Sequence, residues 1–166
     1  MENNFNIGNC YKNTPEVGRI VLGEGPPGAD IMLIGQNPGA EEDKQGRPFV
    51  GRSGKYLNKV LAENNIKRET LFITSVVKYK TPGNRKPTKK EIEDCLPLLI
   101  EQIKSIKPKL IVLMGEAAWQ TPRLEGVQYM ETYHPAAAMR FPGIRAKFET
   151  DFQRLGRMID SIENRS

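Results

Sequence analysis

The amino-acid sequence predicts an α/β fold, with a central four-stranded, mainly parallel sheet between two layers of helices. Short apolar runs typical of strands alternate with amphipathic runs typical of helices. No repeat, low-complexity tract or long linker divides the 166 residues, a length that suits one ordinary domain. We therefore expect a single three-layer α/β/α domain over 1–166, with right-handed crossovers between parallel strands.

The first half of the chain contains two of the expected strands. Residues 1–28 are rich in Asn, Gly and Pro, so we expect them to wrap the surface with little regular structure. The apolar run 31–34 is the first strand. Residues 55–63 carry aliphatic side chains at helical spacing and form a helix. The run 71–77, rich in β-branched residues, is the second strand.

The second half contains the other two strands and three helices. The longest helix is expected over 88–106, because Thr88 and Glu91 form a capping-box pattern at its start. Residues 110–114 are the third strand. The remaining elements are a short helix over 116–120, a fourth strand over 129–132 and a terminal helix over 146–162.

The composition describes a mildly basic, soluble protein. Lys and Arg outnumber Asp and Glu by 25 to 20, and the resulting charge of +5 is compatible with a polyanionic partner without requiring one. No apolar run approaches the roughly 20 residues of a membrane span. The first residues also lack the basic and apolar segments of a signal peptide. We expect a cytoplasmic protein in which Cys10 and Cys95 are reduced thiols rather than a disulfide.

Two polar segments follow predicted strands and mark a candidate site. The segment Gly35-Gln36-Asn37 follows the first strand, and the only histidine, His134, follows the fourth. The carboxyl ends of parallel strands meet at one edge of an open sheet, so these side chains should face the same cleft. Taken alone, the first segment also fits a plain β-turn, and a lone histidine also fits a structural role.

Five short motifs are specific when taken together in this order. They are Gly23-Glu24-Gly25, Gly46-Arg47-Pro48-Phe49-Val50-Gly51, Val76-Val77-Lys78, Pro82-Gly83-Asn84-Arg85-Lys86-Pro87 and His134-Pro135-Ala136-Ala137. In order and spacing they resemble the uracil-DNA glycosylase superfamily, most closely the family 4 (type 4/5-like) enzymes of archaea and bacteria. The similarity extends from about Gly23 to Phe152, which is most of the chain.

The resemblance implies a base-excision site. Enzymes of this superfamily flip a damaged nucleotide into a pocket and break the bond between base and sugar. His134 matches the histidine that stabilises the departing base anion at O2, and Phe49 matches the aromatic that stacks on the base. Core packing is the alternative for that ring. The implied catalytic residues are Gln36, Asn37 and His134, and the implied base-binding residues are Gly35, Gln36, Phe49 and Ser75.

Two motifs depart from the family 4 pattern. The usual motif is Gly-Glu-Ala-Pro-Gly, whereas here Gln36 replaces the glutamate and Asn37 resembles the mismatch-specific and single-strand-selective branches. An amide can orient a water molecule but cannot accept its proton. Ser75 replaces the asparagine that usually reads the uracil edge, so hypoxanthine and xanthine are further candidate substrates.

The basic segment 78–90 suits contacts with DNA phosphates, although a solvated charged loop is the ordinary interpretation of such a run. Arg52 and the segment Met139-Arg140-Phe141 are candidates for a clamp and for a wedge into the vacated stack. The implied DNA-binding residues are Arg52, Lys78, Lys80, Arg85, Lys86, Met139 and Arg140.

Family 4 enzymes commonly hold a four-iron cluster on four cysteines, and this chain has two cysteines. Cys95 matches the last of the four, and Cys10 lies near one of the first pair. Tyr79 stands where the third would be. Two thiolates cannot supply the four protein ligands, so we expect no iron–sulfur cluster and no other metal.

The resemblance and the residues together predict a monomeric, monofunctional DNA glycosylase that removes uracil from DNA and leaves an abasic site. A catalytically weak damaged-DNA-binding protein of the same fold is the alternative, suggested by Gln36 and Ser75. A third possibility is a nucleotide-handling domain that acts on small molecules, for which the basic segment 78–90 has no obvious use.

Overall fold

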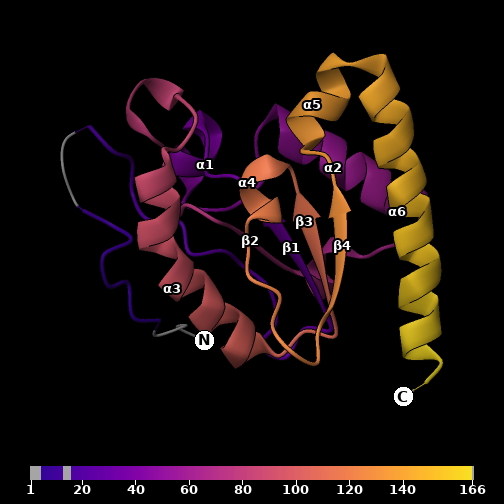
Figure 1. Cartoon of the computed structure of the whole chain (residues 1–166). Helices are drawn as coiled ribbons and strands as arrows, with labels where there is room; N and C mark the ends of the chain where they lie inside the picture. The colour runs from indigo at the N-terminus through magenta and orange to yellow at the C-terminus, as the bar shows by residue number, and fades with distance from the viewer. Residues whose placement is uncertain (1–4, 13–15, 166) are drawn as a thin grey trace.

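The computed structural model describes residues 5–12 and 16–165, and in this part of the chain a parallel sheet lies between two helical layers (Figure 1). Its strand order is β2-β1-β3-β4, and every neighbouring pair is parallel. This confirms the predicted three-layer α/β/α fold. The strands are β1 (Ile31–Gly35), β2 (Phe72–Ser75), β3 (Leu110–Met114) and β4 (Gln128–Thr132).

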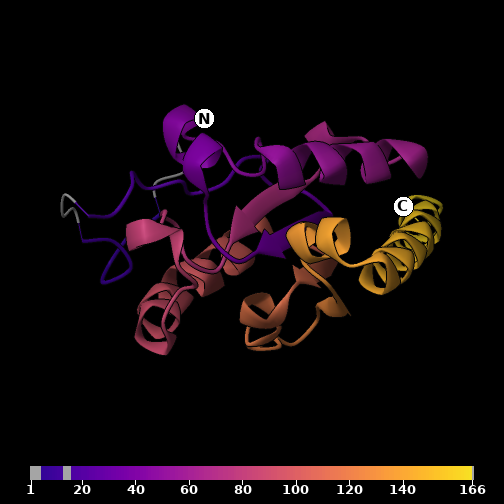
Figure 2. The same cartoon turned by 90° about the horizontal axis from the view of Figure 1, so that it is seen from above.

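The helices cover both faces of the sheet. Helices α3 and α4 lie on one side and α2 on the other, as the view from above shows (Figure 2). None of the described helices is long and apolar enough to cross a membrane. The α-helices are α1 (Ala40–Gln45), α2 (Arg52–Glu63), α3 (Lys89–Ile106), α4 (Glu116–Trp119), α5 (Pro135–Arg140) and α6 (Pro142–Glu163), and two 3₁₀ turns are η1 (Arg68–Thr70) and η2 (Pro82–Asn84).

Each strand divides its side chains between two hydrophobic cores. Met32 and Ile34 of β1 belong to the core under α3, whereas Ile31 and Leu33 belong to the core under α2 and α6. This alternation follows from the two-residue period of a strand. Because both faces are covered, every residue of β1, β2 and β3 is buried, which explains why these strands are almost continuously apolar in the sequence.

Helices α1 and α5 are absent from the sequence prediction. Helix α1 has no buried residue, so it lacks the apolar periodicity that reveals a helix in a sequence. Helix α5 spans six residues and begins directly after His134. Strand β2 is shorter than predicted and ends at Ser75, where the chain turns away from the sheet.

The N-terminal segment lies against β2 and α3. Glu24 forms an isolated antiparallel bridge with Ile73 of β2. Cys10 and Cys95 are joined by a disulfide, which corrects the expectation of two reduced thiols. The two cysteines are 85 positions apart in the sequence. Their contact depends on how the N-terminal segment folds back onto α3, which residue spacing alone does not reveal.

Candidate active site

The carboxyl ends of the four described strands point to one edge of the sheet, toward α1 and α5 (Figure 1). A pocket of about 210 Å³ opens at this edge. Its volume lies below the roughly 300–1,000 Å³ that is typical of sites for drug-sized ligands, so it suits one small flat molecule such as a nucleobase. Its lining residues are Gln36, Asn37, Pro38, Gly39, Glu42, Pro48, Phe49, Ser53, Ser75, Asn84 and His134.

His134 follows β4 and caps the N-terminus of α5. Its Nδ1 accepts a hydrogen bond from the backbone N–H of Ala136 at 3.1 Å. A neutral imidazole that accepts at Nδ1 carries its proton on Nε2. Burial lowers the pKa of His134 to about 4, although the carboxylate of Glu42 opposes this shift. The histidine is therefore a neutral donor in the pocket at physiological pH.

Gly115 lets the histidine approach the end of β3. Its φ is +95°, and a Cβ at this position would lie 3.1 Å from the Cβ of His134. The backbone N–H of Gly115 also donates to the carbonyl of Thr132, at 2.9 Å. The chain after β4 can thus pass close over β3, which brings His134 toward β1.

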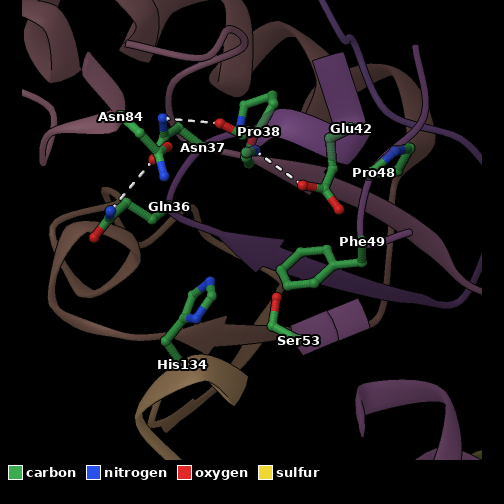
Figure 3. Close-up of a pocket in the computed structure, with 11 residues that line it drawn as sticks. Gln36, Asn37, Pro38, Glu42, Pro48, Phe49, Ser53, Asn84 and His134 are labelled. Carbon is green, nitrogen blue, oxygen red and sulfur yellow. Dashed lines mark hydrogen bonds between the residues drawn. The ribbon is translucent and has the colours of Figure 1, made fainter. Parts of the chain in front are cut away.

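Phe49 faces the histidine from the loop before α2 (Figure 3). The two ring centroids are 5.6 Å apart, and their planes are tilted by 31°. Gly35 lies below both rings, because a Cβ there would be 2.5 Å from Phe49 Cζ and 3.7 Å from His134 Nε2. The bare backbone of Gly35 therefore lets Phe49 and His134 approach each other, although Gly35 is not among the residues that line the pocket.

Glu42 connects the two loops that frame the pocket. One carboxylate oxygen accepts from the N–H of Gly39 at 3.0 Å. The other accepts from the N–H groups of Val50 and Gly51, at 2.8 and 2.7 Å. This carboxylate therefore fixes the loop that carries Phe49 against the loop that follows β1.

The amides of Gln36 and Asn37 lie on the opposite wall and bond to each other (Figure 3). Gln36 Nε2 donates to Asn37 Oδ1 at 3.3 Å, and Asn37 Nδ2 donates to the carbonyls of Pro38 and Tyr79, both at 3.2 Å. The donor side of Asn37 is thus occupied by backbone. Its oxygen retains a second lone pair that can accept from a water molecule.

Ser75 and Lys78 lie where β2 ends. The hydroxyl of Ser75 is buried at the pocket and donates to the carbonyl of Val77 at 2.6 Å. Lys78 is fully buried, and its Nζ donates to Thr74 Oγ1 at 2.7 Å and to the carbonyl of Ser75. Burial lowers the pKa of Lys78 well below its ordinary value. The structure therefore places Lys78 inside the turn after β2, where its side chain is not exposed to solvent.

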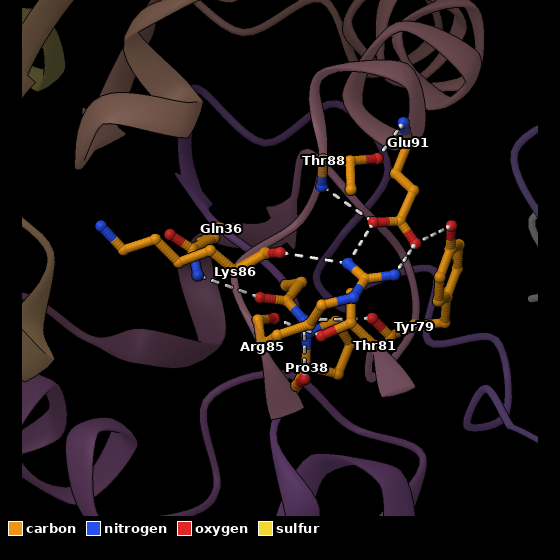
Figure 4. Close-up of polar contacts among 9 residues, drawn as sticks. Gln36, Pro38, Tyr79, Thr81, Arg85, Lys86, Thr88 and Glu91 are labelled. Carbon is orange, nitrogen blue, oxygen red and sulfur yellow. Dashed lines mark hydrogen bonds and ion pairs between the residues drawn. The ribbon is translucent and has the colours of Figure 1, made fainter. Parts of the chain in front are cut away.

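Within the rest of the basic segment, residues 83–86 are exposed before α3, whereas Tyr79 and Thr81 are buried (Figure 4). Arg85 is turned toward the helix, where its guanidinium pairs with Glu91 at 2.6 Å. Glu91 in turn accepts from the N–H of Thr88 and completes the predicted capping box. Lys86 is exposed and extends away from this cluster, and Lys80 is half-buried.

A second, wider hollow of about 620 Å³ adjoins the pocket and shares Glu42 and Ser53 with it. Its walls are the first turns of α1 and α2 and one side of α5. The structure brings three predicted DNA-binding residues together here, namely Arg52, Met139 and Arg140. The two arginines are exposed.

Sequence reasoning missed Glu42 and Asn84 as pocket residues. Glu42 stands at the third position of α1 after Gly39, the spacing at which a glutamate reaches back to the start of its helix. Asn84 lies in the Pro82–Asn84 turn with a φ of 57°, a conformation that asparagine tolerates better than most residues. Both signals are present in the sequence, but neither indicates a pocket by itself.

The cysteines do not fit a four-iron cluster in this structure. Cys10 and Cys95 bond to each other, and a cluster would need four thiolates. Among the described residues, no group of three or more His, Cys, Asp or Glu side chains could hold a metal ion. The absence of a cluster stays a prediction.

Comparison with known proteins places this site in a family. Residues 22–156 match the family model described as "Uracil DNA glycosylase superfamily". The chain belongs to this superfamily. Membership identifies the protein as a DNA glycosylase, a hydrolase of base-excision repair.

Curated members of the superfamily are similar to most of the chain. A type-4 uracil-DNA glycosylase of Pyrobaculum aerophilum is 39% identical over 79% of this chain and 79% of its own length. A type-4 enzyme of Archaeoglobus fulgidus is 35% identical over 83% of this chain and 81% of its own. A type-5 uracil-DNA glycosylase of Pyrobaculum aerophilum is more distant, at 27% identity over 76% and 70%.

Proposed function

We propose that the protein excises uracil from DNA by hydrolysing the bond between base and sugar and leaves an abasic site. The observation that carries this proposal is the neutral His134, which lines the pocket opposite the Phe49 ring and carries its proton on Nε2. The names of the superfamily members that are 35% to 39% identical support uracil as the base.

The pocket residues have complementary roles in this reaction. The flipped base stacks on Phe49, and His134 donates to the base O2, where negative charge develops as the bond breaks. The amide oxygens of Gln36 and Asn37 orient the water that adds to the sugar C1′. The water's proton leaves to solvent or to the departed base, because neither amide can accept it. No lysine is among the residues that line the pocket. The Nζ of Lys78 is buried against Thr74, so it is not available as a nucleophile.

The set of bases that the pocket accepts depends on Ser75. Its hydroxyl proton is used on the Val77 carbonyl, so only oxygen lone pairs face the base. An asparagine would offer a donor and an acceptor together. We therefore propose that hypoxanthine and xanthine are also admitted. Ser75→Asn is expected to raise the ratio of uracil to hypoxanthine excision, measured on matched oligonucleotides, and an unchanged ratio would contradict this account.

We propose that DNA lies across the pocket mouth and the neighbouring hollow, and that the protein acts as a monomer. Arg52 and Arg140 supply exposed charge on the side of the hollow, and Lys86 supplies it in the loop before α3, whereas Lys80 is half-buried. Phe141 is 51% exposed at the end of α5 and is suited to enter the gap left by the flipped base. Lys78 takes no part, because it is buried.

The proposal is tested by incubating the protein with oligonucleotides that carry uracil, hypoxanthine, xanthine or mismatched thymine, followed by cleavage at abasic sites. Strand cleavage at uracil supports the proposal. Tight binding without cleavage would favour the damaged-DNA-binding alternative, for which the absence of a general base at Gln36 and Asn37 is the relevant observation. If the protein neither binds nor cleaves these oligonucleotides, a small-molecule substrate would be favoured.

A further inference from the structure

The backbone of Phe49 is held in an unusual conformation. Its φ is +49°, a region that side chains other than glycine enter rarely. Two glycines make the room for it. A Cβ at Gly35 would lie 2.5 Å from the Phe49 ring, and a Cβ at Gly54 would lie 2.1 Å from the Phe49 carbonyl. Such a conformation persists only where the surroundings hold it in place.

Arg68 holds this backbone from outside the pocket. The residue lies in η1, before β2, and its guanidinium donates to the carbonyls of Pro48 at 2.6 Å and Phe49 at 2.7 Å. Its side chain is only 19% exposed. The guanidinium also donates to Asn58 Oδ1 at 2.7 Å and pairs with Glu24 at 3.4 Å. Asn58 and Glu24 therefore orient the planar guanidinium toward the two consecutive carbonyls of Pro48 and Phe49.

The opposite side of the same loop is held by Glu42, which accepts from the next two backbone N–H groups. A cation therefore bonds the carbonyls of Pro48 and Phe49, and an anion bonds the amides that follow. Glu42 lines the pocket, whereas Arg68 does not. A role for Arg68 in the reaction must therefore act through the Pro48–Phe49 backbone.

We propose that Arg68 is a positioning residue of the base pocket, which fixes the Pro48–Phe49 backbone and thereby the place of the Phe49 ring opposite His134. The inference rests on the proposed function, in which the base stacks on that ring. A lysine at this position could not replace the guanidinium, because an ammonium lacks two parallel donors in a fixed plane.

A spectroscopic test reads the ring position without any activity. His134 is the only histidine, so its imidazole C–H protons give one pair of NMR signals, and the Phe49 ring lies 5.6 Å away. Arg68→Lys should shift these signals in the same direction as Phe49→Ala. In the Phe49→Ala background it should add nothing, because the ring it positions is gone. Signals that do not move in Arg68→Lys would overturn the proposal.

Two further variants keep this test decisive. Asn58→Ala removes a partner of the guanidinium while keeping its charge, and should shift the same signals by a smaller amount. If Arg68→Lys fails to fold, an unchanged spectrum in Asn58→Ala overturns the proposal instead. Arg154→Lys, an exposed arginine of α6, is the matched control and should leave the signals in place.

A binding test connects the ring position to the base. Arg68→Lys should raise the inhibition constant of free uracil by roughly 5-fold and leave the affinity for abasic-site DNA unchanged. An equal loss of both affinities would show that Arg68 acts on the whole fold, and would overturn the proposal. If the unmodified protein does not excise uracil, the proposed function fails, whereas the NMR comparison still decides whether Arg68 positions Phe49.

Discussion

The pocket and the neighbouring hollow share Glu42 and Ser53, but they differ in the charge and exposure of their other functional side chains. In the pocket, burial keeps the imidazole of His134 neutral, and its polar atoms are aimed by backbone contacts. In the hollow, Arg52 and Arg140 are exposed to solvent. Fixed neutral dipoles act strongly where water is excluded, whereas exposed charges attract phosphate over a distance and are screened by salt. The comparison predicts that changes in the pocket affect bond cleavage and that changes in the hollow affect DNA binding.

The sharpest test of the pocket is His134→Ala. Loss of the donor at the base O2 should lower the single-turnover rate of uracil excision by about 10²–10³-fold. Affinity for abasic-site DNA should change little, because the hollow is intact. The rate is measured with enzyme in excess over a uracil oligonucleotide. An effect below about 10-fold would exclude the histidine from the chemistry.

Asn37→Ala addresses the water-orienting wall and should lower the same rate at least about 10-fold. Its Nδ2 also bonds the Tyr79 carbonyl, so a thermal melt of the variant is needed beside the rate. Asn164→Ala, at the exposed end of α6, serves as the control. An unchanged rate would remove Asn37 from the mechanism.

The hollow is tested by Arg52→Ala combined with Arg140→Ala. DNA affinity should fall, and the slope of log affinity against log salt should become shallower by about 2, because each arginine is expected to neutralise one phosphate. The single-turnover rate at saturating enzyme should stay the same. Arg154→Ala with Arg157→Ala on α6 removes equal charge elsewhere. If both pairs change the slope equally, the hollow has no special role in binding DNA.

The smallest effect is expected from pH. Because burial lowers the pKa of His134 to about 4, the imidazole stays neutral as the pH passes through 6.5, its ordinary pKa. Excision should therefore be independent of this titration down to roughly pH 5, and should change only as protonation of Nδ1 breaks the bond from Ala136. A rate that falls with a midpoint near 6.5 would contradict a neutral donor.

The sequence predicts the parts of the site that depend on topology. Parallel strands bring their carboxyl ends together, so Gln36 and His134 could be placed in one cleft from the sequence, whereas the position of Phe49 was implied by the family resemblance. Lys78 shows where this reasoning stops. In the sequence it begins a basic run, whereas in the structure a turn after β2 buries its ammonium against Thr74 and Ser75. Local charge does not reveal which side of a turn a side chain takes.

The disulfide leads to the same conclusion, because its formation depends on where the N-terminal segment lies in the fold and not on the spacing of the cysteines in the sequence. Helix α1 shows a third case, because a helix without a buried face leaves no periodic signal.

The disulfide also divides the chain into a closed covalent ring and two tails, the longer of which follows Cys95. The backbone from Cys10 to Cys95 and the bond between them form a loop that contains β1, Phe49 and β2. His134 lies outside this loop. A single cut in the exposed stretch 83–86 leaves one covalent molecule until a reductant opens it. A cut between 96 and 133 instead removes the covalent connection between the histidine and the stacking wall once the sheet and core unfold, so the two halves of the pocket differ in how they are covalently joined.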